Sequence, residues 1–412
     1  MHAMKRILFL AATVLGVWAA AGCEGLSTDS GGSSAKPIVL TKSQTAVMEQ
    51  GNDFAFKLLS ECHSEFKGEN LFLSPMGVTI VSSMLANGAD GATYDEIVEA
   101  IGLKGYSLDK INDCYSTLVA ALYKADPKIS LSLANSIWAA KDLTFKGKFC
   151  DNMKKTFDAE SYSVDFGSEG TLKQVNDWCS KKTSGLIPKM FDQLSPLTRA
   201  LLINALYFKG DWVYSFAKEQ TYEGEFLALA GGKAKMPFMT MSRELEAYQD
   251  KDISIVKLPY GNGAFFLEAL MPTGDFKTFL SSLSLAQLQR WDAAVHTTKA
   301  DLHFPKITAE FDTDENLVPV LMRLGMKKAF SASEADFSQM ADEGLFVSNF
   351  RQKTFVQLDE KGTEAAAVTV AEMRKNSAGG SDSIYLHFSR PFVYLIRESS
   401  TGAILFIGTK VK

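Results

Sequence analysis

The sequence DEKGTEAAAVTVAEMRKNS at residues 359–377 is the most informative segment of this chain. Strand-like apolar segments precede it at 355–358 and follow it at 384–388. Most hairpin loops span two to about five residues, so this connection is far longer than a hairpin needs. A connection of this length without structure of its own is usually functional or disordered. The segment is therefore the first candidate for a functional site.

Read as a strand, the segment has two different faces, because side chains alternate along a strand. The small, uncharged face consists of Thr363, Ala365, Ala367, Thr369, Ala371 and Met373. The opposite face consists of Glu364, Ala366, Val368, Val370, Glu372 and Arg374. The uncharged face is suited to burial, so the segment has the pattern of a strand that is not yet in a sheet. Gly362 at its start supplies a joint that can take positive φ.

The run EKGTEAAA at 360–367 resembles the hinge of the reactive-centre loop in inhibitory serpins, the suicide protease inhibitors. In serpins this loop adds to a sheet as a new strand and releases stored strain. The hinge residues that the resemblance implies are Glu360, Gly362, Thr363, Glu364, Ala365, Ala366 and Ala367.

Further serpin motifs follow in family order between Phe54 and Lys412. NLFLSP at 70–75 resembles the motif at the shutter, where the central sheet must part to admit the loop. LINALYFKGDW at 202–212 is similar to one of the most specific family signatures. The resemblance implies an α+β fold with three β-sheets, eight or nine helices and an exposed reactive-centre loop.

The run at 201–208 is almost continuously apolar, which is typical of a central strand buried on both faces. Asn204 is its one polar interruption, and a buried amide needs hydrogen-bond partners. The resemblance places Trp212 at the breach, where the loop first enters the sheet, and pairs Lys306 with Glu360. The shutter and breach residues that it implies are Ser74, Asn204, Gln352, Trp212 and Lys306.

Two positions depart from the family pattern. The serine usually found just after Ser74 and Pro75 is Gly77, and the histidine usually found before the hinge strand is Gln352. We expect a smaller polar network through Asn204 and Gln352. Shutter opening therefore has weaker support from the sequence than the hinge has.

The family spacing of seventeen residues, counted from Glu360, places the reactive bond between Asn376 and Ser377. Arg374 and Lys375 each offer a long cation that suits an acidic specificity pocket, whereas Asn is a poor anchor for most serine proteases. We predict cleavage after Lys375 by trypsin-like serine proteases, with Asn376 as the alternative. The partner would be a target serine protease, or also a cysteine protease, held as a covalent acyl complex.

The N-terminus has the pattern of an export signal, with Lys5 and Arg6 before an apolar run at 7–21 that is too short to span a bilayer. AAGC at 20–23 resembles a bacterial lipoprotein cleavage box with Cys23 as the lipid-bearing residue, although Ala20 departs from the usual Leu. The alternative is an ordinary secretory signal. We expect a lipoprotein of the outer membrane or cell surface, or else a secreted or periplasmic protein.

The expected organisation is a signal peptide at 1–22, a flexible tether at 23–40 and one serpin domain at 41–412, because no linker or charge run divides the last segment. The net charge of -5, with dispersed signs, gives no footprint for nucleic acid. Membrane contact is expected only through the lipid, and the protein is expected to be a monomer. The remaining cysteines show no CxxC pair, which favours buried free thiols; they are Cys62, Cys114, Cys150 and Cys179.

The sequence offers little support for an enzyme. GxSxG, HExxH, P-loop and GxGxxG motifs are absent, and two SxxK matches at Ser64 and Ser107 lack their SDN and KTG companions. No cofactor or metal is expected. The alternative function is that of a non-inhibitory serpin-fold binding protein, but such members usually carry bulky or charged hinge residues, unlike 365–367.

Overall fold

The computed structural model of this chain describes residues 35–363 and 383–412. Ser34–Lys412 form one compact unit. The predicted signal peptide, Cys23 and most of the predicted tether lie outside the described residues, as do residues 364–382 of the central segment. The first helix, α1 (Lys42–Glu65), begins at a capping box in which Thr41 and Gln44 each bond the other's backbone N–H.

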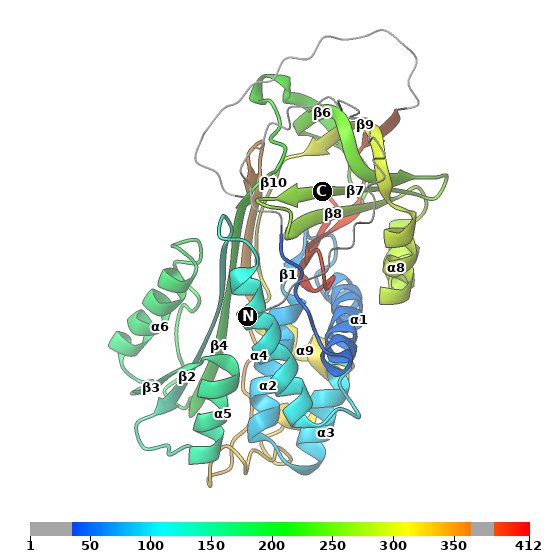
Figure 1. Cartoon of the computed structure of the whole chain (residues 1–412). Helices are drawn as coiled ribbons and strands as arrows, with labels where there is room; N and C mark the ends of the chain where they lie inside the picture. The colour runs from blue at the N-terminus through cyan, green and yellow to red at the C-terminus, as the bar shows by residue number, and fades with distance from the viewer. Residues whose placement is uncertain (1–34, 364–382) are drawn as a thin grey trace, which may run out of the picture. The chain divides into compact units, whose positions relative to one another are not determined.

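One sheet has six strands and contains the segment that the sequence singles out (Figure 1). Its spatial order is β10 (Ile307–Asp312), β11 (Lys353–Leu358), β12 (Gly362–Thr363), β4 (Ala200–Asp211), β2 (Ser130–Ala140) and β3 (Glu160–Val164). The β2–β3 pair is parallel and the other pairs are antiparallel. The short strand β12 therefore separates two much longer strands.

The second sheet has nine strands. Eight run in the order β1 (Phe72–Leu73), β15 (Ile404–Lys410), β14 (Phe392–Glu398), β8 (Phe265–Pro272), β7 (Ile253–Tyr260), β6 (Lys233–Gln249), β9 (His296–Pro305) and β13 (Ile384–His387), and β5 (Tyr222–Leu227) pairs with β6. The resemblance implied three separate sheets, but two of them form this one continuous sheet. They are joined by the 17-residue strand β6, which pairs with β5 near its start and with β7 near its end.

Nine α-helices lie within the described residues, which agrees with the expected eight or nine. Besides α1, the helices are α2 (Pro75–Gly88), α3 (Gly91–Ala100), α4 (Leu108–Ala125), α5 (Gly147–Phe157), α6 (Glu169–Lys182), α7 (Phe276–Ser282), α8 (Leu285–Ala294) and α9 (Leu317–Arg323). Three short 3-10 turns are at Lys218–Gln220, Asp314–Asn316 and Lys328–Phe330. Figure 1 shows α6 on one side of β2, β3 and β4, and α2 and α4 on the other.

The helix α2 occupies the centre of the core. Its N-terminus follows from the sequence, since Ser74 caps the helix by accepting from the Gly77 N–H and Pro75 is the first helical residue. Almost all of its side chains are buried, because it packs against β4 on one side and β15 on the other. The helix therefore packs against one face of the six-stranded sheet, at β4.

The four described cysteines are free thiols, as expected, and Cys150 is the one that is only half-buried. Within residues 35–363 and 383–412, no group of three or more His, Cys, Asp or Glu side chains is placed to hold a metal ion. No helix in that part of the chain is long and apolar enough to cross a bilayer.

Candidate functional site

The strand β4 is paired along its length on one side only. Toward β2 its register is continuous from Ala200 to Lys209. Toward β12 its register covers Gly210 and Asp211. From Ala200 to Leu206, no described strand lies in register with β4 on this side. A strand edge of this kind presents backbone donors and acceptors to which another strand can add.

The neighbouring strand β11 has the same asymmetry. It pairs with β10 along all six of its residues, but with β12 only at Leu358, opposite Thr363. Below that point, the chain at 344–352 faces β4 across an open cleft, and this stretch is not itself a strand. The six-stranded sheet therefore has room for a continuation of β12.

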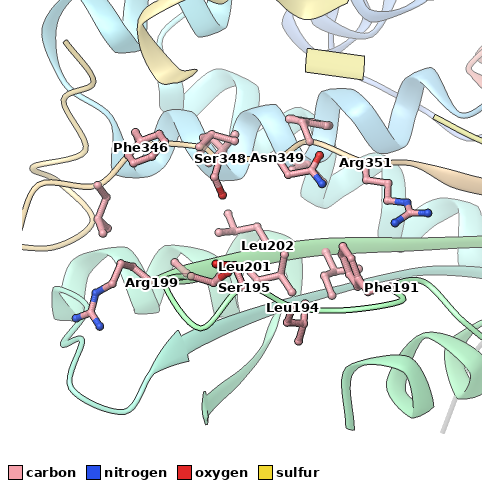
Figure 2. A pocket seen from close by; sticks show the side chains of 18 of the residues that line it. Phe191, Leu194, Ser195, Arg199, Leu201, Leu202, Phe346, Ser348, Asn349 and Arg351 are labelled. Carbon is pink, nitrogen blue, oxygen red and sulfur yellow. The ribbon is translucent and has the colours of Figure 1, made fainter. Parts of the chain in front are cut away.

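The cleft between β4 and residues 344–352 has a volume of about 610 Å³. Figure 2 shows its two sides: Phe346, Ser348, Asn349 and Arg351 face Phe191, Leu194, Ser195, Arg199, Leu201 and Leu202. Residues of α2, including Gly77 and Val78, also line it. Cavities of this size hold drug-sized ligands or several side chains of an extended peptide.

The cleft also corrects the prediction that 201–208 is buried on both faces. Ile203 and 205–208 are buried, but Leu201 and Leu202 are only half-buried. The reason is that these two leucines line the cleft instead of a neighbouring strand. The apolar pattern thus indicates the burial that the strand would have in a complete sheet.

The hinge enters the sheet at Gly362. This residue has a φ of 152°, and a Cβ there would lie 2.2 Å from the Gly210 carbonyl oxygen and 2.6 Å from the Asp211 Cα. A side chain at this position is therefore excluded. Thr363 follows with 3 % exposure, and its hydroxyl lies 2.9 Å from the Tyr260 hydroxyl. Glu364, Ala365, Ala366 and Ala367 lie outside the described residues.

Trp212 holds the turn that leads into the hinge. Its indole Nε1 donates to the Asp359 carbonyl oxygen at 2.8 Å, and its backbone N–H donates to that of Lys361 at 2.7 Å. Its ring stacks on Tyr260 with centroids 4.3 Å apart. Tyr260 thus contacts both the predicted breach tryptophan and the hinge threonine. The sequence analysis missed Tyr260, because its role depends on pairing between distant strands.

Glu360 and Lys306 form the ion pair that the resemblance implied, with 2.7 Å between the Lys306 Nζ and the Glu360 Oε1. The Thr221 hydroxyl donates to the same oxygen at 2.8 Å. Burial alone would raise the pKa of Glu360, but the hydrogen bonds from Lys306 and Thr221 outweigh it and hold the pKa below its usual value. The pair is partly exposed, so it stabilises the fold by only about 1 kcal/mol.

Gln352 fixes the start of α2. Its Oε1 accepts from the Ser74 N–H at 2.8 Å, and its Nε2 donates to the Ser74 carbonyl oxygen at 2.9 Å. The Ser74 hydroxyl donates to the Leu405 carbonyl oxygen at 2.8 Å. The side-chain amide thus pairs with a backbone donor and acceptor as a neighbouring strand would.

Asn204 belongs to a different network. Its Nδ2 donates at 2.8 Å to the Oδ1 of Asn135, the residue opposite it on β2. The single network expected through Asn204 and Gln352 is therefore wrong, because each amide bonds another residue. The signal for the missed partner is weak in the sequence, since Asn135 is simply an amide within another apolar run.

The glycine at position 77 has a physical reason. A Cβ there would lie 2.7 Å from the Asn204 Oδ1 and 2.8 Å from the Leu206 Cδ1. The Asn204 Oδ1 is buried and has no hydrogen-bond partner among the described residues. Glycine at this position therefore leaves room for the Asn204 and Leu206 side chains to approach α2, and a larger residue would require those two side chains to shift. The residues of the predicted reactive bond, Arg374, Lys375, Asn376 and Ser377, lie outside the described residues.

Comparisons with known proteins agree with this architecture. A family model described as serpin (serine protease inhibitor) matches residues 49–412. Serpin B10 of Mus musculus is 30 % identical over 388 residues, which cover 87 % of this chain and 97 % of the relative. Serpin-ZXA of Oryza sativa subsp. japonica is 32 % identical over 359 residues, which cover 83 % and 89 %.

Two solved structures are also similar. Human thyroxine-binding globulin in complex with thyroxine has a TM-score of 0.81 and 27 % identity, with 90 % of this chain and 99 % of that chain covered. The thermophilic serpin tengpin in the native state has a TM-score of 0.81 and 26 % identity, with 92 % and 97 % covered. The α+β fold predicted from the motifs is therefore confirmed.

The two hydrogen bonds between the Gln352 side chain and the Ser74 backbone, which we call the Gln352 clamp, should contribute to the free energy of unfolding. We expect Gln352→Leu to lower the free energy of unfolding by about 2 kcal/mol, because two hydrogen bonds are lost and the buried Ser74 N–H is left without a partner, while the Ser74 carbonyl oxygen keeps the Val78 N–H. The control is Gln357→Leu on β11, whose side chain makes only a 3.5 Å contact with Asp359. Urea unfolding of the three proteins measures this difference, and equal losses in both variants would contradict the clamp.

The Glu360–Lys306 pair should give a pH-dependent difference. The folded-state pKa of Glu360 is depressed, so its contribution is present above the ordinary glutamate pKa of about 4.3 and is lost as the pH falls through the lower folded value. We expect Lys306→Met to reduce the free energy of unfolding by about 1 kcal/mol at neutral pH, and by much less in acid. Lys251→Met, at an exposed turn, is the control. A difference that persists unchanged in acid would argue against the pair.

Proposed function

This chain belongs to the serpin family, and from that premise we propose that it inhibits serine proteases by cleavage and insertion of its own reactive-centre loop. Serpins are mostly protease inhibitors and not catalytic enzymes. The observation that carries the proposal is the side of β4 that, among the described strands, has none in register from Ala200 to Leu206. β12 already occupies the entrance to this gap.

The proposed reaction begins as ordinary proteolysis. The serine hydroxyl of the protease attacks the carbonyl carbon of the reactive residue, an ester forms, and the amine of the following residue leaves. The new loop end stays attached to the protease through this ester. The loop then extends β12 along β4 before water can hydrolyse the ester.

Insertion has enough driving force to displace a bound protease. About ten new backbone hydrogen bonds at about 1 kcal/mol net each give on the order of 10 kcal/mol. This is comparable to the whole stability of a typical domain. Small inward residues are needed because the loop must pass between packed elements, and the buried Thr363 supports this inward face.

The proposed reactive residue is Lys375, with Asn376 as the alternative, and the proposed targets are trypsin-like. A non-inhibitory binding role is the second class. Thyroxine-binding globulin, a similar structure, is described with thyroxine bound. The small side chains at 365–367 favour insertion over such a role.

We further propose export as a bacterial lipoprotein through Cys23, on the pattern of residues 1–23 alone. The two relatives named above come from a mouse and a rice plant, so bacterial origin rests on the same pattern. The Ser- and Gly-rich residues after Cys23 would act as a tether between the lipid and the folded unit.

A charge at the entrance to the gap should convert the inhibitor into a substrate. With trypsin, we expect wild type to give a complex that survives denaturing electrophoresis, and Thr363→Arg to give only cleaved chain, because a buried arginine stalls insertion. Thr297→Arg, on an exposed position of β9, is the matched control. Cleaved wild type should also melt at a higher temperature than intact protein. Equal amounts of complex from wild type and Thr363→Arg would reject the mechanism.

The reactive bond can be read from the released fragment. We expect the C-terminal peptide of a brief trypsin reaction to begin at Asn376, because the Lys375 side chain fits an acidic specificity pocket. Mass spectrometry of the denatured complex identifies the peptide. A peptide that begins at Ser377 would assign the bond to the alternative, Asn376, and one that begins at Lys375 would assign it to Arg374.

A further inference from the structure

We propose that four residues beside the C-terminal end of the loop form a second contact site for the protease, which engages a basic side chain next to the protease active site. This inference rests on the proposed function. We call the site the edge surface, and its residues are Tyr222, Asp301, His303 and Tyr385. They come from three strands, β5, β9 and β13.

The edge surface is an exposed aromatic cluster. Tyr385 is 53 % exposed and Tyr222 is 39 % exposed. Both rings contact His303, with centroid distances of 5.1 Å for Tyr385 and 5.6 Å for Tyr222. The Tyr222 hydroxyl also lies 2.9 Å from the His303 Nδ1. Large aromatic side chains that gather on a surface are typical of interaction sites.

The edge surface is supported by strand pairing and by contacts with a buried ring. β13 and β9 pair in parallel, with His387 opposite His303 and Tyr385 opposite Asp301. Behind the surface, the His387 ring lies 5.3 Å from that of His303 and 5.0 Å from that of the fully buried Phe238. The His303 ring, which both tyrosine rings contact, is therefore held from the protein side before any partner arrives, and this lowers the side-chain entropy lost on binding.

Chain length limits how far the protease can be from this surface. Tyr385 is ten residues from Lys375, and a chain of ten residues spans at most about 35 Å. A protease domain of roughly 220 residues has a radius of gyration of about 17 Å, so its full width is comparable to that span. A protease that holds Lys375 in its active site is therefore within reach of the edge surface.

The chemistry of the surface favours a cation. The Asp301 side chain is 46 % exposed, and its nearest ion-pair partner in the described residues is the His303 Nε2 at 3.8 Å. The carboxylate thus has accepting capacity left, and it lies opposite the exposed Tyr385 ring. A lysine or arginine can pair with a carboxylate and lie over an aromatic face at the same time. The partner is therefore a protease surface loop that carries such a residue.

The test measures how fast trypsin attacks the loop. We expect the second-order rate constant for loop cleavage to fall about tenfold in the double variant Asp301→Asn, Tyr385→Ala, which corresponds to about 1.4 kcal/mol. Asp301→Asn alone should reduce the dependence of this rate on salt, because one charge pair is removed. Asp151→Asn on α5, at an exposed position, is the control that should leave the rate unchanged.

The outcomes separate this inference from the proposed function. Cleavage of the loop is measurable whether it ends in a covalent complex or in turnover, so a protein that forms no complex still tests the edge surface. If the double variant disturbs folding, the isosteric Asp301→Asn variant and the charge reversal Asp301→Lys replace it, and the reversal should be slower still. Rates within twofold of wild type for all edge-surface variants, with unchanged salt dependence, would overturn the proposal.

Discussion

The side of β4 that faces no described strand from Ala200 to Leu206 is the constraint on which the rest of this structure depends. Backbone N–H and C=O groups that lack partners are expensive when they are removed from water, and a folded chain normally pairs nearly all of them. Among the described residues, β12 consists of Gly362 and Thr363, and a cleft of about 610 Å³ lies beside β4. Under the proposed mechanism, a more hydrogen-bonded arrangement is within reach of the same chain.

The contacts that hold this incomplete state are individually small. The Lys306–Glu360 pair is partly exposed and worth about 1 kcal/mol. The amide of Gln352 adds two hydrogen bonds, and the indole of Trp212 adds one at the turn before the hinge. Against an insertion of on the order of 10 kcal/mol, these contacts cannot make the open sheet the most stable state. In the proposed mechanism they hold it kinetically until the chain is cleaved.

The two departures from the family pattern, Gly77 and Gln352, lie in one region and can be described together. At position 77 the Asn204 amide and the Leu206 side chain lie where a Cβ would be in close contact with them. Gln352 bonds the Ser74 backbone directly, and Asn204 bonds Asn135 across β4 and β2. In place of a hydroxyl and an imidazole, this chain has a glycine and a side-chain amide, and the polar contacts here come from amides. The shutter is still held by polar contacts, but they connect other pairs of residues.

The sequence by itself determined the fold family through resemblance to serpin motifs, and it indicated the hinge glycine and the apolar strand at 201–208 through local pattern: a joint without a side chain and a continuous apolar run. It also indicated the pair between Lys306 and Glu360 through resemblance. Only the tertiary structure decided that Tyr260 contacts the hinge, that Asn135 is the partner of Asn204, and that Tyr222 and Tyr385 meet at His303. These contacts join residues on different strands, and their geometry is set by register between segments far apart in the chain, which no local pattern encodes.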